Sequence, residues 1–253
     1  MSAAITSEGR TTGWLEIARG LRDVVFPPSC LQCGGLVEAG GFKHVCEKCA
    51  PLIACVEAPH CTTCGHPFFG EVEGERMCPH CEGLRPEFEE GRTLALFKGP
   101  ARAMIHELKY RHGLHVLADL EALARRSEYV MGYVHGAVLV PVPMHPRKLR
   151  ERGYDQAALL AEMLARAAGG GTRVEPVLRR VLDTQSQTAF DRTARRTNLK
   201  NAFALREGVT ITPGSPYLLV DDVFTTGSTL NACAGVLRQA GALSLRVVTF
   251  CHG

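Results

Sequence analysis

Nine of the eleven cysteines lie between Cys30 and Cys81, and eight of these nine occur in C-x-x-C pairs. Each pair supplies two thiolates from one tight turn, and structural Zn²⁺ is held by four such ligands in a tetrahedron. Twelve residues separate the first two pairs and thirteen separate the last two. This repeated spacing predicts two structural zinc sites, which leave no open position for catalysis. The predicted ligands are Cys30, Cys33, Cys46, Cys49, Cys61, Cys64, Cys78 and Cys81.

The spacing leaves open whether the two sites are sequential or interleaved. Sequential sites close the shorter loops, so we prefer them. The histidines beside these pairs are interpreted as bystanders, with His80 as an alternative ligand; they are His44, His60, His66 and His80. Cys55, Cys233 and Cys251 have no paired partner and are expected in the core or at the surface.

The cysteine-rich segment has little apolar periodicity, so metal is expected to hold it together. It contains three basic residues (Lys43, Lys48 and Arg76) against six glutamates. That balance disfavours binding of phosphate groups. We therefore interpret the segment as a module docked on a larger domain, and a grip on nucleic acid or on a protein partner is the alternative.

A second chemical pattern lies at residues 217–229, where an apolar strand ends in Asp221 and Asp222 and a turn with Gly227 opens a helix. The amides of such a turn form a socket for phosphate together with the helix N-terminus. The two carboxylates would repel phosphate, but they suit the hydroxyls of a ribose. The pattern predicts a ligand with a 5′-phosphate and free 2′- and 3′-hydroxyls. Further donors to the phosphate are the hydroxyls of Thr225, Thr226, Ser228 and Thr229.

Positive charge is concentrated in one block. The net charge is +3, whereas residues 141–206 contain 13 Lys and Arg against 6 Asp and Glu. Such a block should face an anion. Within it, residues 183–201 have almost no apolar anchor and are interpreted as a loop that closes over the ligand. A basic surface patch for DNA phosphates is the alternative. The basic side chains of this loop are Arg192, Arg195, Arg196 and Lys200.

The composition of the 253-residue chain is that of a globular protein, with 45% hydrophobic and 22% charged residues. No run approaches the roughly 18 apolar residues that span a bilayer. The N-terminus lacks the apolar region of a secretory signal. Paired thiols in such a chain read as metal ligands rather than as a secreted disulfide scaffold. These features exclude disordered and membrane proteins and favour a cytoplasmic location.

The elements that must position these groups alternate along the chain. Strands are predicted at residues 94–97, 136–142, 174–182, 217–222 and 244–250, and helices at residues 12–25, 101–110, 114–126, 154–168 and 228–240. Alternating strands and helices predict a largely parallel α/β sheet covered on both faces. Ligands of such sheets bind at the carboxyl ends of the strands. The predicted organisation is an N-terminal helix (1–28), a double zinc ribbon (29–85) and an α/β domain (86–253).

Residues 221–229 resemble the phosphoribosyl-pyrophosphate (PRPP) signature of type I phosphoribosyltransferases. The Arg-Gly-Tyr-Asp-Gln string at residues 152–156 and the Arg-Arg-Thr-Asn string at residues 195–198 resemble the bacterial competence ComF family. That family also carries N-terminal cysteine knuckles. The resemblance covers nearly the whole chain from Phe26 and implies a type I phosphoribosyltransferase-like sheet over residues 86–253. One departure is Asp155, where the family usually has Asn.

The resemblance also implies a set of site residues. Asp221, Asp222 and Arg195 would be catalytic, with Mg²⁺ bound together with PRPP. The loop after an early strand would receive pyrophosphate at Val142 and Pro143. The PRPP-binding residues would be Asp221, Asp222, Thr225, Thr226, Gly227, Ser228, Thr229, Val142, Pro143, Arg147, Lys148, Arg152 and Lys109.

Two functions stay open at this point. The first is an enzyme that transfers phosphoribose from PRPP to an acceptor, which the sequence does not name. The second is a binding protein that uses the same fold to sense PRPP or to handle DNA or protein partners. The expected partners are PRPP, the acceptor, and single-stranded DNA or competence proteins, without a membrane.

Overall fold

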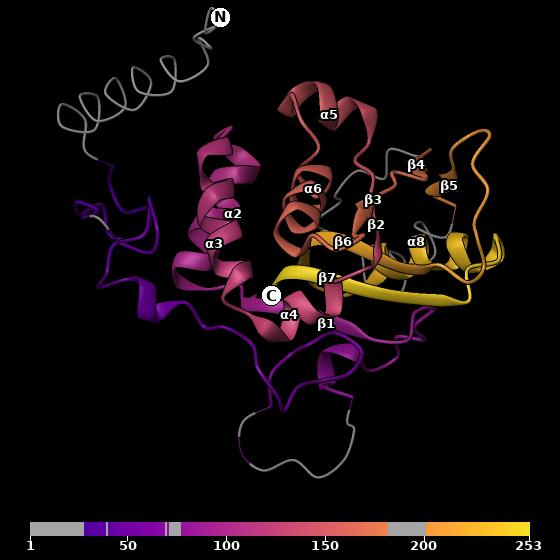
Figure 1. Cartoon of the computed structure of the whole chain (residues 1–253), viewed down its shortest axis with the longest axis horizontal. Coiled ribbons are helices and arrows are strands. Elements are labelled where there is room, and N and C mark those ends of the chain that lie inside the picture. The colour runs from indigo at the N-terminus through magenta and orange to yellow at the C-terminus, as the bar shows by residue number, and fades with distance from the viewer. Residues whose placement is uncertain (1–27, 39, 69, 71–76, 182–200) are drawn as a thin grey trace, which may run out of the picture.

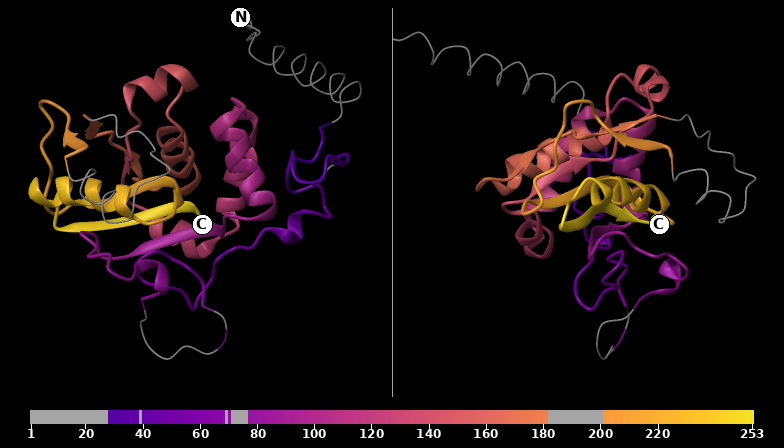
Figure 2. Two further views of the ribbon diagram at one scale, coloured as in Figure 1. Left: turned by 180° about the vertical axis from the view of Figure 1, so that it is seen from behind. Right: turned by 90° about the vertical axis from the view of Figure 1, so that its right-hand side faces the viewer.

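The computed structural model describes residues 28–38, 40–68, 70, 77–181 and 201–253. A β-sheet with helices on both faces forms its centre, and the cysteine-rich segment runs along one side (Figures 1 and 2). The strands are β1 (Gly91–Leu96), β2 (Val138–Pro141), β3 (Arg173–Val174), β4 (Leu178–Arg180), β5 (Phe203–Leu205), β6 (Pro216–Phe224) and β7 (Ser244–His252). The α-helices are α2 (Gly99–Tyr110), α3 (Leu117–Arg125), α4 (Glu128–Val134), α5 (Pro146–Arg152), α6 (Gln156–Ala168) and α8 (Ser228–Gln239). Short 3₁₀ helices are η2 (Ala50–Leu52), η3 (Pro79–Cys81) and η4 (Leu114–Val116).

Among the described residues, the main sheet has five strands in the order β1-β7-β6-β2-β3. All four neighbouring pairs are parallel. β4 and β5 form a separate antiparallel pair. The parallel sheet flanked by helices that the sequence predicts is confirmed.

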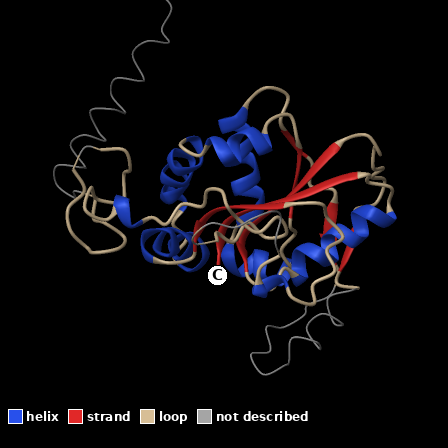
Figure 3. Cartoon of the chain, turned by 90° about the horizontal axis from the view of Figure 1, so that it is seen from below, coloured by secondary structure: helices blue, strands red, loops and turns tan. Residues whose placement is uncertain are grey.

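The two faces of the sheet have separate cores, because neighbouring residues of a strand point to opposite faces. Leu218 and Val220 of β6 belong to the core that α2, α3, α4 and α6 cover. Tyr217 and Leu219 belong to a second core, which α8 covers. The sheet therefore lies between two helical layers (Figure 3).

The cysteine-rich segment forms two lobes. The first lies beside α2 and α3, and the second lies below β1 (Figure 1). The chain between them follows the outer edge of β1, where Val56 N donates to Leu94 O at 3.0 Å and Leu96 N donates to Ala54 O at 2.8 Å. The cysteine-rich segment thereby extends the sheet beyond its edge strand.

A buried carboxylate fixes the first lobe to α3. Asp119 is 1% exposed. Its oxygens accept hydrogen bonds from Lys43 N at 2.6 Å and His44 N at 2.8 Å, and His44 Nδ1 lies 3.0 Å from Oδ2. Charge-assisted bonds of this kind are about twice as strong as neutral ones.

Replacing Asp119 with alanine is expected to lower the free energy of unfolding by about 2–4 kcal/mol, because two backbone amides lose their acceptors. Urea denaturation would measure the change. Glu121→Ala is the matched control on the same helix: Glu121 pairs with Arg125 at 2.8 Å, but both side chains are partly exposed, so its loss should cost under about 1 kcal/mol. Equal effects of the two substitutions would contradict the anchoring role of Asp119.

The structure differs from the predicted elements in several places, and one of them is β5, which lies where no strand is predicted. β6 continues to Phe224, two residues beyond its predicted end, because its pairing with β7 extends as far as His252. The single strand predicted at residues 174–182 is wrong: β3 belongs to the main sheet and β4 pairs with β5. α4 and α5 occupy stretches where no helix is predicted. The predicted helix at residues 12–25 lies outside the described residues. None of the helices in the described part is long and apolar enough to cross a bilayer.

Candidate functional site

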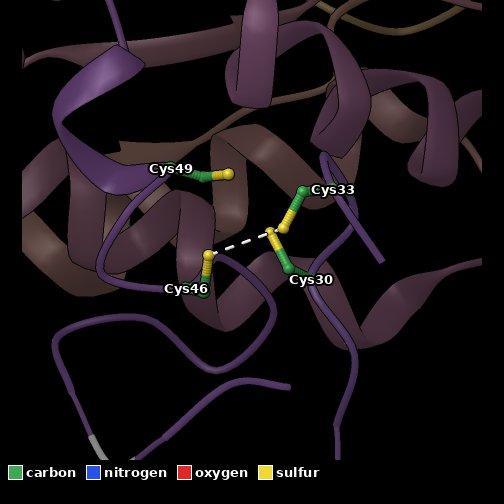
Figure 4. Close-up of side chains that lie close together, drawn as sticks. All are labelled: Cys30, Cys33, Cys46 and Cys49. Atoms are coloured by element: carbon green, nitrogen blue, oxygen red, sulfur yellow. Dashed lines mark hydrogen bonds between the residues drawn. The ribbon is translucent and has the colours of Figure 1, made fainter. Parts of the chain in front are cut away.

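The eight paired cysteines form two groups of four, and within each group the sulfur atoms all lie within 4.8 Å of one another. The first group is Cys30, Cys33, Cys46 and Cys49 (Figure 4), and the second is Cys61, Cys64, Cys78 and Cys81. The sites are therefore sequential, as preferred from the sequence. Individual sulfur–sulfur distances are 3.7 Å in the first group and 3.4–4.0 Å in the second. A zinc tetrahedron with Zn–S bonds of about 2.3 Å has sulfur atoms about 3.8 Å apart, so both groups fit zinc.

The second group is held tightly against β1. A Cβ on Gly65 would lie 2.5 Å from Thr93 N, and a Cβ on Gly91 would lie 2.3 Å from Thr63 O. Thr93 Oγ1 also donates to Cys64 O at 2.9 Å. The backbone of this knuckle and the backbone of the strand thus approach too closely for any side chain between them.

The paired carboxylates lie inside β6 rather than at its end, and side chains from two helices reach the second of them. Lys109 Nζ of α2 lies 2.8 Å from Asp222 Oδ1. Gln156 Nε2 of α6 donates to Asp222 Oδ2 at 2.9 Å. Arg152 in turn donates to Gln156 Oε1. Asp222 is thus held in place from both helices, with a cation beside it.

Asp221 behaves differently from its neighbour. Burial, followed by the charge of Asp222, raises the pKa of Asp221 to about 8. Its Oδ1 accepts a hydrogen bond from Asp222 N at 2.8 Å. Hydroxyl donors or a cation placed on this carboxyl would favour its charged form and lower that pKa. Asp221 therefore has the properties expected of a carboxyl group whose charged form is stabilised when a ligand binds.

The turn that follows β6 presents unused donors. Within the described residues, the backbone amides of Thr225, Thr226 and Gly227 donate to no acceptor. Thr226 Oγ1 lies 3.0 Å from Ser228 Oγ and accepts from Ser228 N at 3.4 Å. Gly227 has φ +68°, and the left-handed conformation there turns the chain into the first residue of α8. Successive amides at the start of a 12-residue helix form an anion socket.

The loop after β2 reaches this site through the backbone. Val142 N donates to Val220 O at 3.0 Å, directly before the carboxylate pair. Val142 and Pro143 are buried. The next residues are held by Asp155, whose carboxylate accepts from Met144 N at 3.1 Å and from the first amides of α6 at 3.0 and 3.2 Å. Asp155, which stands where the family usually has Asn, is thus the N-cap of α6. Asp is among the residues preferred at this position.

The basic residues expected beside pyrophosphate take different positions. Arg147 and Lys148 are exposed on α5, where Arg147 pairs with Glu151 at 3.0 Å. Arg152 lies nearer, bonded to Gln156 and with its guanidinium 5.9 Å from the ring of Tyr110. Arg195 and the rest of the loop at residues 183–200 lie outside the described residues, so their role stays a prediction.

Gln156 and Tyr154 received no role from the sequence, although both belong to the Arg-Gly-Tyr-Asp-Gln string. Tyr154 OH donates to Leu108 O, which ties the start of α6 to α2. Gln156 links Arg152 with Asp222. Their position in that string was the only sign in the sequence that they matter. Their partners could not be predicted, because each partner lies on another element.

Comparison with known proteins gives three kinds of match. The double zinc ribbon domain family matches residues 21–82. Competence protein F of Haemophilus influenzae is 29% identical over 223 residues, 86% of this chain and 94% of that protein. DNA utilization protein YhgH of Escherichia coli K12 is 31% identical over 233 residues, 89% of this chain and 97% of that protein. Competence protein ComFC of Bacillus subtilis is 26% identical over 211 residues, 79% of this chain and 80% of that protein.

A solved hypoxanthine phosphoribosyltransferase of Staphylococcus aureus also matches, with a TM-score of 0.32 and 16% identity over 53% of this chain and 62% of that chain. That overlap is too small to carry an argument about function. The architecture found here is a parallel α/β sheet flanked by helices, with an N-terminal segment that matches the double zinc ribbon family. The chain belongs to the ComF family, which includes competence protein F and YhgH.

Proposed function

We propose that this protein binds PRPP together with Mg²⁺ and transfers the phosphoribosyl group to an acceptor. One observation carries the proposal: Asp221 and Asp222 are followed by a turn in which three backbone amides have no acceptor among the described residues. The turn suits the 5′-phosphate, and the carboxylates suit the ribose hydroxyls. The names of the relatives, a competence protein and a DNA utilization protein, support a role of this activity in DNA uptake.

In the proposed reaction, the bond between the anomeric carbon and pyrophosphate breaks and the bonding electron pair leaves with pyrophosphate. A new bond forms between that carbon and the acceptor, which loses a proton. Mg²⁺, when bound, supplies neutralisation of the pyrophosphate charge. Asp221 offers hard oxygen ligands and negative charge beside a sugar that becomes positive. Arg152 and the predicted Arg195 add cations on the leaving-group side.

A second candidate is a protein that binds PRPP without turnover. It is favoured by the contact between Lys109 and Asp222, because a fixed ammonium already neutralises one of the two carboxylates. In that case the site recognises the sugar phosphate and reports its presence to DNA or protein partners.

Joint replacement of Asp221 and Asp222 by asparagine is expected to lower the affinity for Mg²⁺–PRPP by about 100-fold or more, since hydrogen bonds to two charged acceptors are lost. Isothermal titration calorimetry would measure it, and Glu207→Gln on the exposed surface is the control. Equal affinity in wild type and double variant would overturn the site assignment. Release of pyrophosphate from PRPP, assayed across bases and nucleic acids, separates the two candidates: tight binding without release favours the second.

A further inference from the structure

The second zinc lobe continues directly into contacts with the proposed phosphate turn. Leu84 N donates to Cys81 O at 2.9 Å, so Leu84 is fixed to the last ligand of the second group. A Cβ added to Gly227 would lie 3.0 Å from Leu84 Cδ2 and 2.5 Å from Phe224 Cζ. Both side chains are buried. The inner side of the turn therefore rests on Leu84 and Phe224 without space between them.

Asn231, one turn into α8, clamps the same segment by hydrogen bonds. Its Oδ1 accepts from Glu87 N at 2.7 Å, and its Nδ2 donates to Arg85 O at 2.9 Å. Its own amide donates to Gly227 O at 2.8 Å. One side chain thus joins the chain that follows the second zinc group to the first turn of the helix whose amides face the ligand.

A row of rings makes a second connection. His66 and His80 belong to the two knuckles of the second group, and their ring centroids lie 4.9 and 5.2 Å from that of His252. The ring of His252 stacks on Phe224 at 5.4 Å with an interplanar angle of 13°. Phe224 in turn lies against Gly227. Both knuckles therefore reach the turn through packed side chains.

The first zinc lobe lacks such contacts in the part of the chain that the structure describes. Its anchors include Asp119 on α3 and the contact of the Arg126 guanidinium with the ring of Phe42 at 4.4 Å. Figure 1 places it beside α2 and α3, away from α8. The two lobes therefore differ in what they support.

We propose that the second zinc group, acting through Leu84 and Asn231 as positioning residues, holds the phosphate turn in its binding conformation, so that metal occupancy at this group and PRPP affinity are coupled. The first zinc group has no such coupling. The proposal rests on the proposed function, because it describes how that binding site is supported. By thermodynamic linkage the coupling acts in both directions: zinc favours PRPP binding, and PRPP favours retention of zinc.

The first test compares variants by calorimetry with Mg²⁺–PRPP. Asn231→Ala and Leu84→Ala are expected to weaken binding by about tenfold, while metal analysis still finds two zinc ions per chain. Asp119→Ala is the matched control, because it loosens the first lobe and should leave the affinity within about twofold. Wild-type affinity in both Asn231→Ala and Leu84→Ala would overturn the coupling while leaving the proposed function intact.

The second test uses the unaltered protein. A chelator and a thiol-alkylating reagent are added, and mass spectrometry follows modification of each cysteine over time. Mg²⁺–PRPP is expected to slow modification of the second group several-fold and to leave the first group unchanged. Equal protection of both groups, or none despite bound PRPP, would overturn the proposal. A wild-type protein that does not bind PRPP would overturn the proposed function and this inference together.

Discussion

Removal of both zinc ions by a strong chelator is expected to unfold the cysteine-rich segment. Structural zinc in small modules contributes an apparent free energy of about 10–16 kcal/mol, which is as large as the total stability of most domains. The four thiols of the second group are almost completely buried. Removal of the metal would leave them around an empty space with no partner to bind. Hydrogen exchange of residues 28–68 and 77–84 should rise to that of an open chain.

The matched control for zinc removal is Cys55→Ser. Cys55 is exposed and outside both groups, so this variant should retain two zinc ions per chain, whereas Cys61→Ser should lose one. Added Zn²⁺ should restore exchange protection of the chelated protein. Full protection after the metal has been removed would show that the segment folds without it.

Gly227→Ala is expected to lower the free energy of unfolding by about 2–5 kcal/mol and to abolish PRPP binding. A left-handed residue with a Cβ costs roughly 1–2 kcal/mol. Crowding against Phe224 and Leu84 adds about 1–3 kcal/mol, because the new methyl group would meet a ring carbon at 2.5 Å. Denaturant titration and calorimetry with Mg²⁺–PRPP would measure the two effects.

Gly208→Ala separates the two causes. Gly208 also has a positive φ, +75°, but nothing lies within 4 Å of the Cβ that would be added. It should therefore show only the backbone cost of about 1–2 kcal/mol. If both alanine variants were equally stable, the contact of Leu84 and Phe224 with the turn would carry no energy.

The zinc groups were predictable because each ligand pair is local. Two thiols three residues apart share one turn whatever the rest of the chain does, and the shorter loops selected the sequential arrangement that is observed. Most helices and the strands β1, β2, β6 and β7 were predictable for a related reason, since apolar periodicity is also a property of neighbouring residues. The boundaries failed where pairing with a distant strand decides, as at Phe224, which β7 holds in the sheet.

The site was predictable only as far as one segment reaches. Asp221, Asp222 and the turn follow each other in the chain, so a shared ligand could be predicted from their carboxylate and hydroxyl side chains. The partners of Asp222 could not, because Lys109 and Gln156 come from helices that only the fold brings together. A lysine on a helix gives no local sign of whether it faces water or a buried acid. The role of Asn231 could not be predicted either, since its two hydrogen-bond partners precede it by more than 140 residues.

The strand order has a consequence for how the chain is made. β7 lies between β1 and β6, and Thr93 of β1 meets Thr249 of β7 across 156 residues. During synthesis β1 therefore emerges from the ribosome long before its partner strand exists. Such non-local pairing folds slowly and exposes an unpaired strand edge in the meantime. The chain on either side of Cys55, already bonded to β1, can cover one edge of that strand from the start. A zinc-loaded nascent segment would thus protect the outer edge of β1 from wrong pairing, while the inner edge stays unpaired until β7 is made.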